Sequence, residues 1–232
     1  MKLSIIIPAH NEQDNIADVI KRVEQSLDIP YELIVVNDHS VDETRNIVEA
    51  LSRQNGNIKL VENELDKGFA NAIKTGLNNA QGDAVVPIMA DLCDDLGTVK
   101  KMFDKINQGY DIVCGSRYMK GGLRIGGSKA KGFFSSFAGH SLHYLLGLPT
   151  HDIANAFKMY RKKAIDSIEI KSRGFEISME MALKAYFLGF KMTEVPTVWR
   201  ERTKGKSSFR ILKLTPSYFK LYLWAILRSL VR

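Results

Sequence analysis

Several features that define other protein classes are missing from this 232-residue sequence. Its two cysteines, Cys93 and Cys114, are too few for a disulfide framework, so we expect reduced thiols and a cytoplasmic location. No window reaches the roughly 18–20 consecutive apolar residues of a membrane-spanning helix. Neither a glycine-rich dinucleotide fingerprint nor a Walker A sequence is present, which excludes a nucleotide site built on a glycine-rich phosphate loop.

Acidic residues are scarce in the second half of the chain. Residues 117–232 hold 22 Lys and Arg against 7 Asp and Glu, whereas residues 1–116 hold 11 against 19. A basic half attracts phosphate groups or an anionic membrane surface, although a solvated basic face has the same composition. We expect no nucleic-acid partner, because aromatic residues do not interleave with the basic ones as in a recognisable binding module.

Strand and helix signals alternate over residues 1–115. Helical spacing of apolar residues predicts helices at about 14–27, 68–80 and 97–107, and Ser40 with Glu43 forms a capping-box pattern that predicts the start of another. Short apolar runs predict strands at 3–7, 33–36, 59–61, 84–90 and 111–115. Continuous apolar strands separated by helices indicate an α/β fold with a mostly parallel sheet covered on both faces.

The pattern changes after residue 117. Residues 119–132 contain five glycines among basic residues, which predicts a flexible basic loop of the kind that often acts as a lid. A phenylalanine-rich helix from Phe133, a strand at 156–160, a helix at 177–188 and an edge strand containing Pro196 are expected after it.

Polar residues follow four of the predicted strands, at the sheet edge where open α/β sheets bind ligands. These segments are residues 8–12, 37–40, 65–69 and 89–95. Carboxylates at such positions can bind a base or ribose, or hold a hard divalent cation through oxygen. A single carboxylate could equally be a helix cap or turn residue, but four segments together favour a nucleotide site.

The same segments resemble the ordered motifs of family 2 glycosyltransferases, which have a Rossmann-like GT-A fold. The chain is most similar to the branch that transfers sugar from nucleotide sugars to dolichyl or other polyprenyl phosphates. This resemblance implies an inverting hexosyltransferase, with mannose from GDP-mannose as the expected donor and UDP-glucose still open. The matching stretches are Ile5–Glu12, Val35–Thr44, Lys67–Ala72 and Gly115–Tyr118, followed by Asp152-x-x-Asn155-x-Phe157-Lys158, Gly174–Glu176 with Glu180, and Arg202-x-x-Gly205-x-Ser207.

The resemblance also implies roles for individual residues. Catalysis would involve Asp91, Arg117, Arg202 and Asp152, with Mg²⁺ or Mn²⁺ bound by Asp91. The acceptor phosphate would be bound by Arg117, Lys131, Ser135, Lys206 and Ser208. The nucleotide would be bound by Pro8, His10, Glu12, Val36, Asp38, Lys67, Gly68 and Ala90.

The metal segment departs from the pattern of the branch. It reads Met89-Ala90-Asp91-Leu92-Cys93 where the branch has Asp-x-Asp-x-Gln, so only the second aspartate is retained. Met and Cys are soft ligands that suit Mg²⁺ poorly and Mn²⁺ somewhat better, and Asp94 or Asp95 could supply the missing oxygen. A lysine of the branch is replaced by Ser208, with Lys206 as the nearest substitute.

The identity of any general base is left open by the sequence. A phosphate acceptor is already an anion and needs positioning more than deprotonation. A hydroxyl acceptor would need a base, for which Asp152 and Glu176 are the candidates, and Glu180 lies one helical turn from Glu176. His140 and His143 have a spacing that permits a metal pair, but without a third ligand we favour packing or a lipid-facing role.

We expect a glycosyltransferase domain over residues 1–210 and an amphipathic helix over 211–232. Residues 200–232 hold nine Lys and Arg and one acidic residue, and aromatic residues occupy much of the remaining helix surface. This profile favours a helix that lies on the cytoplasmic face of a membrane, with packing on the sheet or on a partner subunit as the alternative. Two functional alternatives also stay open: a soluble sugar or polysaccharide acceptor, and a non-catalytic nucleotide-sugar-binding module.

Overall fold

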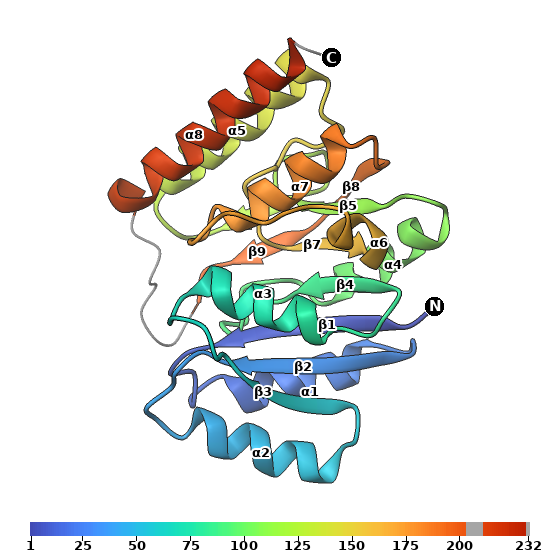
Figure 1. Ribbon diagram of the computed structural model, residues 1–232, viewed down its shortest axis with the longest axis vertical. Helices are drawn as coiled ribbons and strands as arrows, with labels where there is room; N and C mark the ends of the chain where they lie inside the picture. The colour runs from blue at the N-terminus through green and yellow to red at the C-terminus, as the bar shows by residue number, and fades with distance from the viewer. Residues whose placement is uncertain (203–210, 231–232) are drawn as a thin grey trace.

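A seven-stranded sheet with the strand order β3-β2-β1-β4-β7-β5-β8 forms the centre of the molecule (Figure 1). The computed structural model describes residues 1–202 and 211–230. Strand β7 runs antiparallel to both of its neighbours and every other pairing in this sheet is parallel. The strands are β1 (Leu3–Ala9), β2 (Tyr31–Asn37), β3 (Ile58–Glu62), β4 (Ala84–Pro87), β5 (Ile112–Ser116), β7 (Lys158–Arg161) and β8 (Met192–Pro196).

Helices cover both faces of this sheet because its strands are apolar on both sides. In β1, Ile5 and Ile7 pack into the cluster that contains α1, α2 and α4, whereas Ile6 packs into the cluster with α3 and α7. The α/β class and the mostly parallel sheet are therefore confirmed. The helices are α1 (Ile16–Ser26), α2 (Thr44–Gln54), α3 (Phe69–Asn79), α4 (Gly97–Asn107), α6 (Lys162–Asp166) and α7 (Ile177–Phe187).

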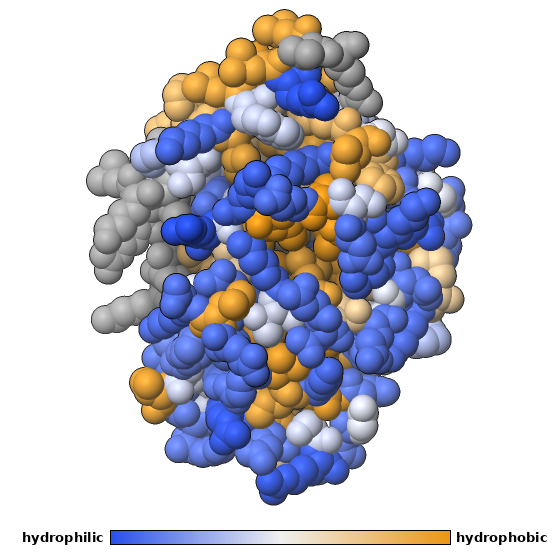
Figure 2. Space-filling view, viewed as in Figure 1, coloured by the Kyte–Doolittle hydropathy of each residue, from blue (hydrophilic) through white to orange (hydrophobic). Residues whose placement is uncertain are grey.

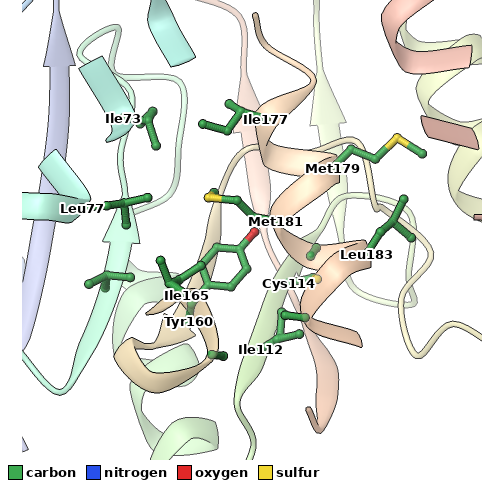
Figure 3. Packing of buried hydrophobic residues seen from close by; sticks show 14 of the residues in the cluster. Ile73, Leu77, Ile112, Cys114, Tyr160, Ile165, Ile177, Met179, Met181 and Leu183 are labelled. Carbon is green, nitrogen blue, oxygen red and sulfur yellow. The ribbon is translucent and has the colours of Figure 1, made fainter. Parts of the chain in front are cut away.

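The second cluster includes side chains of α7, β5 and β7. Figure 3 shows Tyr160 of β7 lying against Met181 of α7 and Ile165 of α6, with Ile112 and Cys114 of β5 beside them. All five side chains are buried. This packing fixes the strands from which the site loops depart.

The predicted capping box at Ser40 and Glu43 is wrong. Helix α2 begins at Thr44, and the Asp42 carboxylate accepts hydrogen bonds from the Thr44 amide at 3.0 Å and from its hydroxyl at 2.6 Å. The Ser40 hydroxyl instead accepts from the Asn11 amide at 3.1 Å. The chain turns at His39, whose φ is 54°, and this turn keeps the next residues out of the helix.

The predicted flexible loop over residues 119–132 is also largely wrong. It contains β6 (Leu123–Ile125), which pairs in parallel with β9 (Val198–Arg200) to form a second, two-stranded sheet. Its last residues start α5 (Lys129–Leu146), where the Ser128 hydroxyl caps the helix by accepting from the Lys131 amide at 3.4 Å. Lys131 therefore lies in a first helical turn.

Helices α5 and α8 (Ile211–Ser229) lie side by side at one end of the molecule (Figure 1). The Tyr222 hydroxyl of α8 donates to the Ser141 hydroxyl of α5 at 3.0 Å, and Trp224 meets Phe187 of α7 edge-on. Ala225 is fully buried. One face of α8 is thus packed on the protein, as in the alternative that the sequence allowed. In the described part of the chain, no helix is both long and apolar enough to span a bilayer.

Gly139 sets how closely α5 approaches the rest of the protein. A Cβ atom at this position would lie 1.9 Å from the His151 carbonyl oxygen. We expect Gly139→Ala to lower the free energy of unfolding by about 1–3 kcal/mol, because backbone must move to relieve the overlap. Chemical denaturation would measure this. Gly56→Ala is the matched control, since nothing lies within 4 Å of its added Cβ, and equal stability of both variants would contradict the packing described here.

Candidate active site

Asp38 joins the loops that follow β2 and β3. Its carboxylate accepts hydrogen bonds from the Gly68 amide at 3.0 and 3.1 Å and from the Asn63 side-chain amide at 2.7 Å. The side chain is 5% exposed. Asp38 and Gly68, both predicted to bind nucleotide, are therefore brought together, and Asn63 is a member of this group that the sequence did not reveal.

Glu12 and Arg202 form an ion pair across the end of β1. One terminal nitrogen of Arg202 lies 3.0 Å from each Glu12 carboxylate oxygen, and the Asn15 amide also donates to Glu12 at 2.7 Å. His10 precedes Glu12 in the same loop and forms a hydrogen bond through Nδ1 with the Asp38 carbonyl oxygen at 2.7 Å. Residues from opposite ends of the sequence thus meet at the edge of the sheet.

The remaining predicted nucleotide-binding residues differ in exposure. Pro8 and Val36 are buried and face each other in register in β1 and β2, and Ala90 is 3% exposed. Their side chains belong to the interior, so only their backbone is placed to contact a ligand. Lys67 is exposed.

Asp91 and Asp94 lie in the loop that follows β4. The chain reverses at Leu92, whose φ is 60°. Asp91 accepts from the Cys93 amide at 3.2 Å, and Asp94 accepts from the Met89 amide at 3.4 Å. Burial, and next the negative charge of Asp91, raise the pKa of Asp94 to about 7. Two carboxylates that repel each other when both are charged therefore lie close together in this loop.

This pair of carboxylates fits a hard divalent cation better than it fits a soft one. Burial and the charge of Asp91 raise the pKa of the Cys93 thiol, so sulfur stays protonated and is a poor ligand. Over residues 1–202 and 211–230 no cluster of three metal-binding side chains occurs. Mg²⁺ is often held by one or two carboxylates together with substrate phosphates, and the 91–94 loop offers such a partial site.

Arg117 and Asp152 form a buried bidentate ion pair. Arg117 donates to Asp152 from its backbone amide at 3.0 Å, from Nε at 2.7 Å and from Nη2 at 2.8 Å. Asp152 is fully buried and the Arg117 side chain is 11% exposed. Both carboxylate oxygens are engaged, which argues against the predicted use of Asp152 as a general base and makes it the residue that orients Arg117.

Tyr118 connects Arg117 to the first turns of α5. Its hydroxyl is bonded to the Ser135 hydroxyl at 2.5 Å and donates to the Gly132 carbonyl at 3.2 Å, and its ring lies 5.1 Å from the Arg117 guanidinium carbon. Arg117 and Ser135, predicted to bind the acceptor phosphate, are thereby held near one another. No role for Tyr118 was predicted from the sequence, although its place directly after Arg117 was a signal. Lys206 and Ser208 lie outside the described residues.

Glu176 and Glu180 do not form a paired-carboxylate site. Glu176 accepts from the backbone amides of residues 173 and 174 at 3.3 and 3.1 Å. Glu180 accepts from the amides of residues 171 and 172 at 2.9 and 2.7 Å and pairs with Lys184. Both glutamates therefore stabilise the turn before α7, which argues against Glu176 as a general base.

His140 and His143 pack against a third histidine that the sequence did not place near them. The His151 ring centroid lies 5.4 Å from that of His140 and 4.0 Å from that of His143. His151 itself is bonded through its amide and its ring to the Glu194 carboxylate at 2.7 and 2.6 Å. The histidines form the contact between α5 and the segment before Asp152.

Sequence comparison agrees with the arrangement of these loops. The profile of glycosyl transferase family 2 matches residues 4–169. The chain belongs to glycosyl transferase family 2. It is accordingly a glycosyltransferase, and the sheet with its covering helices is a GT-A fold.

The proteins to which this chain is similar differ in what their names and bound molecules indicate. The dolichol-phosphate mannosyltransferase of Pyrococcus furiosus is 30% identical over 97% of this chain and 64% of its own length. Glucosyl-3-phosphoglycerate synthase from Mycobacterium tuberculosis, solved with Mn²⁺, UDP-glucose and phosphoglyceric acid, has a TM-score of 0.73 at 18% identity, covering 97% of this chain and 79% of that one. TarS from S. aureus, solved with UDP-GlcNAc, gives 0.68 at 18%, covering 98% and 66%. The chain thus spans less than two thirds of the curated mannosyltransferase.

The Arg117–Asp152 pair yields a test of this glycosyltransferase's architecture. We expect Asp152→Asn to cost about 3–5 kcal/mol of stability, because it leaves a buried guanidinium without a compensating charge. The double variant Arg117→Met/Asp152→Asn should recover part of that loss. Denaturant unfolding of Asp152→Asn, Arg117→Met and the double variant would measure the difference, and strictly additive losses would show that the two side chains are not coupled.

Proposed function

We propose that this glycosyltransferase transfers a hexose, with inversion, from a nucleotide sugar to a polyprenyl phosphate at the surface of a membrane. GDP-mannose is the proposed donor and a dolichyl-type phosphate the proposed acceptor. The mannosyltransferase of P. furiosus supports this acceptor class by its name. The observation that carries the proposal is an exposed apolar face formed by α5 and α8.

This apolar face is concentrated at one end of the molecule, where α8 and α5 lie (Figure 2). Among the described residues, nine of the fifteen exposed large apolar side chains lie on α5, on α8 or at Leu230. Lys220 and Arg228 are exposed on α8 as well. Exposed aromatic and aliphatic residues mixed with cations suit the boundary of an anionic lipid layer. The apolar residues are Phe133, Phe134, Phe137, Tyr144, Leu145, Phe219, Leu223, Leu227 and Leu230.

The acceptor residues lie at one end of this face. Ser135 lies between Phe134 and Phe137 in the sequence of α5. Its hydroxyl is bonded to that of Tyr118, whose ring lies beside the Arg117 guanidinium group. Lys131 lies in the first turn of the same helix. A lipid phosphate whose chain lies among the phenylalanines would therefore bring its headgroup to Ser135, Lys131 and Arg117, the residues proposed to bind it.

The donor would bind across the ends of β1, β2 and β4. We assign the base and ribose to the loops held by Asp38 and Glu12, and the diphosphate to the region of Asp91, Asp94 and Arg202. A divalent cation, Mg²⁺ or Mn²⁺, held by the two aspartates would stabilise the negative charge of the departing nucleoside diphosphate. The acceptor phosphate is an anion and attacks the anomeric carbon once Arg117 and Ser135 hold it in line.

A soluble acceptor is the second candidate. The two solved relatives described above carry UDP-sugars, and the synthase from M. tuberculosis carries phosphoglyceric acid, a soluble anion. A UDP-sugar donor and a small phosphorylated acceptor would use the same cationic residues. The exposed apolar face favours the lipid acceptor, because a soluble acceptor has no need of it.

Transfer assays test the reaction directly. Incubation with radiolabelled GDP-mannose or UDP-glucose, short-chain polyprenyl phosphate and Mn²⁺ or Mg²⁺ should put label into the organic phase. Because Asp91 is proposed to hold the cation, Asp91→Asn should lower this transfer by about a hundredfold or more. Asp104→Asn, on an exposed position of α4, is the matched control. Absence of transfer with every donor would refute the proposal, and label transferred only to soluble acceptors would favour the second candidate.

Vesicle binding tests the apolar face. Replacing Phe133 and Phe137 by serine should weaken binding to vesicles that contain anionic lipid by about tenfold or more, because two exposed aromatic rings no longer leave water. Val41→Ser, at a side chain that is 90% exposed on another loop, should leave binding unchanged. Unchanged binding of the double serine variant would exclude a lipid partner for this face, and a change in oligomeric state would identify it as a subunit interface.

A further inference from the structure

Lys158 is a buried cation in the middle of the central sheet. It lies in β7, between β4 and β5, and is 0% exposed. Its ammonium group donates to the carbonyl oxygens of Ile153 at 2.9 Å, of Ser178 at 3.4 Å and of Asn155. None of the ion pairs found among the described residues includes Lys158. An unpaired buried charge is destabilising, so packing alone does not account for a lysine here.

The position of this lysine relates it to Arg117. Two of the three carbonyl groups that it binds, those of Ile153 and Asn155, belong to the segment that begins with Asp152, the partner of Arg117. Asn155 closes the same segment onto β5 by donating to the Gly115 carbonyl oxygen at 2.7 Å. Because Asp152 cancels the charge of Arg117, the pair has no net charge. With Lys158 the group has a net charge of +1.

We propose that Lys158 supplies the net positive charge of the phosphate site at Arg117, acting through the 152–155 segment without touching the ligand. It is a positioning residue in this role, because it holds the carbonyl groups that place Asp152 and therefore Arg117. The proposal rests on the function proposed above, in which Arg117 binds the acceptor phosphate. It adds a positive charge that is buried in the sheet and does not contact the ligand.

Among the titratable groups around Lys158, Lys158 itself is the one that changes its charge in the mildly alkaline range. Burial lowers the pKa of Lys158 from 10.5 to about 8, opposed by Cys114 and Asp152. Burial raises the pKa of Cys114 to about 11 and that of Tyr160 well above its ordinary value. Burial also raises the pKa of Tyr218 in α8, which lies near the same Ser178. Arg117 stays charged, and the His151 ring beside Asp152 is bonded to Glu194. Asp94, whose charge acts on Arg117, has its pKa raised to about 7 and so loses its proton below this range.

The direction of the pH effect follows from these charges. Below about pH 8 Lys158 is protonated and the group of three carries +1; above it the group is neutral and attracts phosphate less strongly. A phosphate monoester is already largely a dianion above pH 7, since its second pKa is about 6, so its own charge does not change in this range.

The acceptor KM as a function of pH tests the proposal. For the wild type we expect KM for short-chain polyprenyl phosphate to rise by about threefold to tenfold between pH 7 and 9.5, with a smaller change in kcat. Lys158→Met should have the raised KM already at pH 7 and no further rise. Lys74→Met is the matched control, because Lys74 also donates to a backbone carbonyl, that of Ser172 at 2.8 Å, and should keep the wild-type profile. A wild-type KM that does not change over this range, or a rise that persists in Lys158→Met, would overturn the proposal.

A second measurement works without turnover. Between pH 8 and 10.5 the unfolded chain keeps a proton on Lys158 that the folded protein has lost, so the free energy of unfolding of the wild type should rise with pH relative to that of Lys158→Met. The raised pKa values of the Cys93 and Cys114 thiols act in both proteins and cancel in this comparison. A difference between the two proteins that stays constant with pH would overturn the assignment. If no donor and acceptor pair supports transfer, the proposed function fails by itself. Calorimetric binding of a soluble short-chain alkyl phosphate, a monoester whose charge is constant above pH 7, then tests Lys158 by itself. Binding that weakens between pH 7 and 9.5 in the wild type but not in Lys158→Met supports the proposal, and equal wild-type binding at both pH values refutes it.

Discussion

The ion pair between Arg117 and Asp152 is the interaction on which the rest of the site depends. It joins the end of β5 to the segment before β7 with three hydrogen bonds to a fully buried carboxylate. On one side of it, Tyr118 leads to Ser135 and the start of α5. On the other side, the His151 ring packs against His143 of α5, and the His151 backbone amide donates to the Glu194 carboxylate. Movement of this pair would therefore shift both Arg117, which is proposed to bind phosphate, and the helix that carries the other residues proposed to bind the acceptor.

The sequence was sufficient for the sheet because hydrophobic patterning is local. Runs such as Ile5–Ile7 and Leu33–Val36 indicate buried strands whatever lies next to them. The partners of polar side chains are a different matter, since they depend on tertiary contacts. Glu12 was expected to bind nucleotide and Arg202 phosphate, but nothing local indicates that they bind each other across 190 positions. For the same reason Asp152 was a candidate base until its two oxygens were found on Arg117.

The unusual residues of the segment that is proposed to hold the metal also have a structural reason, which the sequence alone does not reveal. Cys93 contributes through its backbone: its amide donates to Asp91 and its carbonyl accepts from the Arg200 amide of β9 at 3.0 Å. A buried thiol fits this position because the side chain points into the interior and stays uncharged. Position 93 thus connects the loop after β4 to the two-stranded sheet, and Asp94 is left as the nearby oxygen donor.

The placement of α5 and α8 links fold and proposed acceptor. A helix pair that served only to cover the sheet would bury its phenylalanines, yet Phe133, Phe134 and Phe137 are each more than half exposed. The same helix has Lys131 in its first turn and carries Ser135 next to Tyr118. An acceptor with a phosphate at one end and a long apolar chain at the other matches this sequence of cationic, hydroxyl and aromatic groups along one helix. A soluble phosphorylated acceptor would match only the first two, and the exposed rings would then lower solubility without any compensating contact.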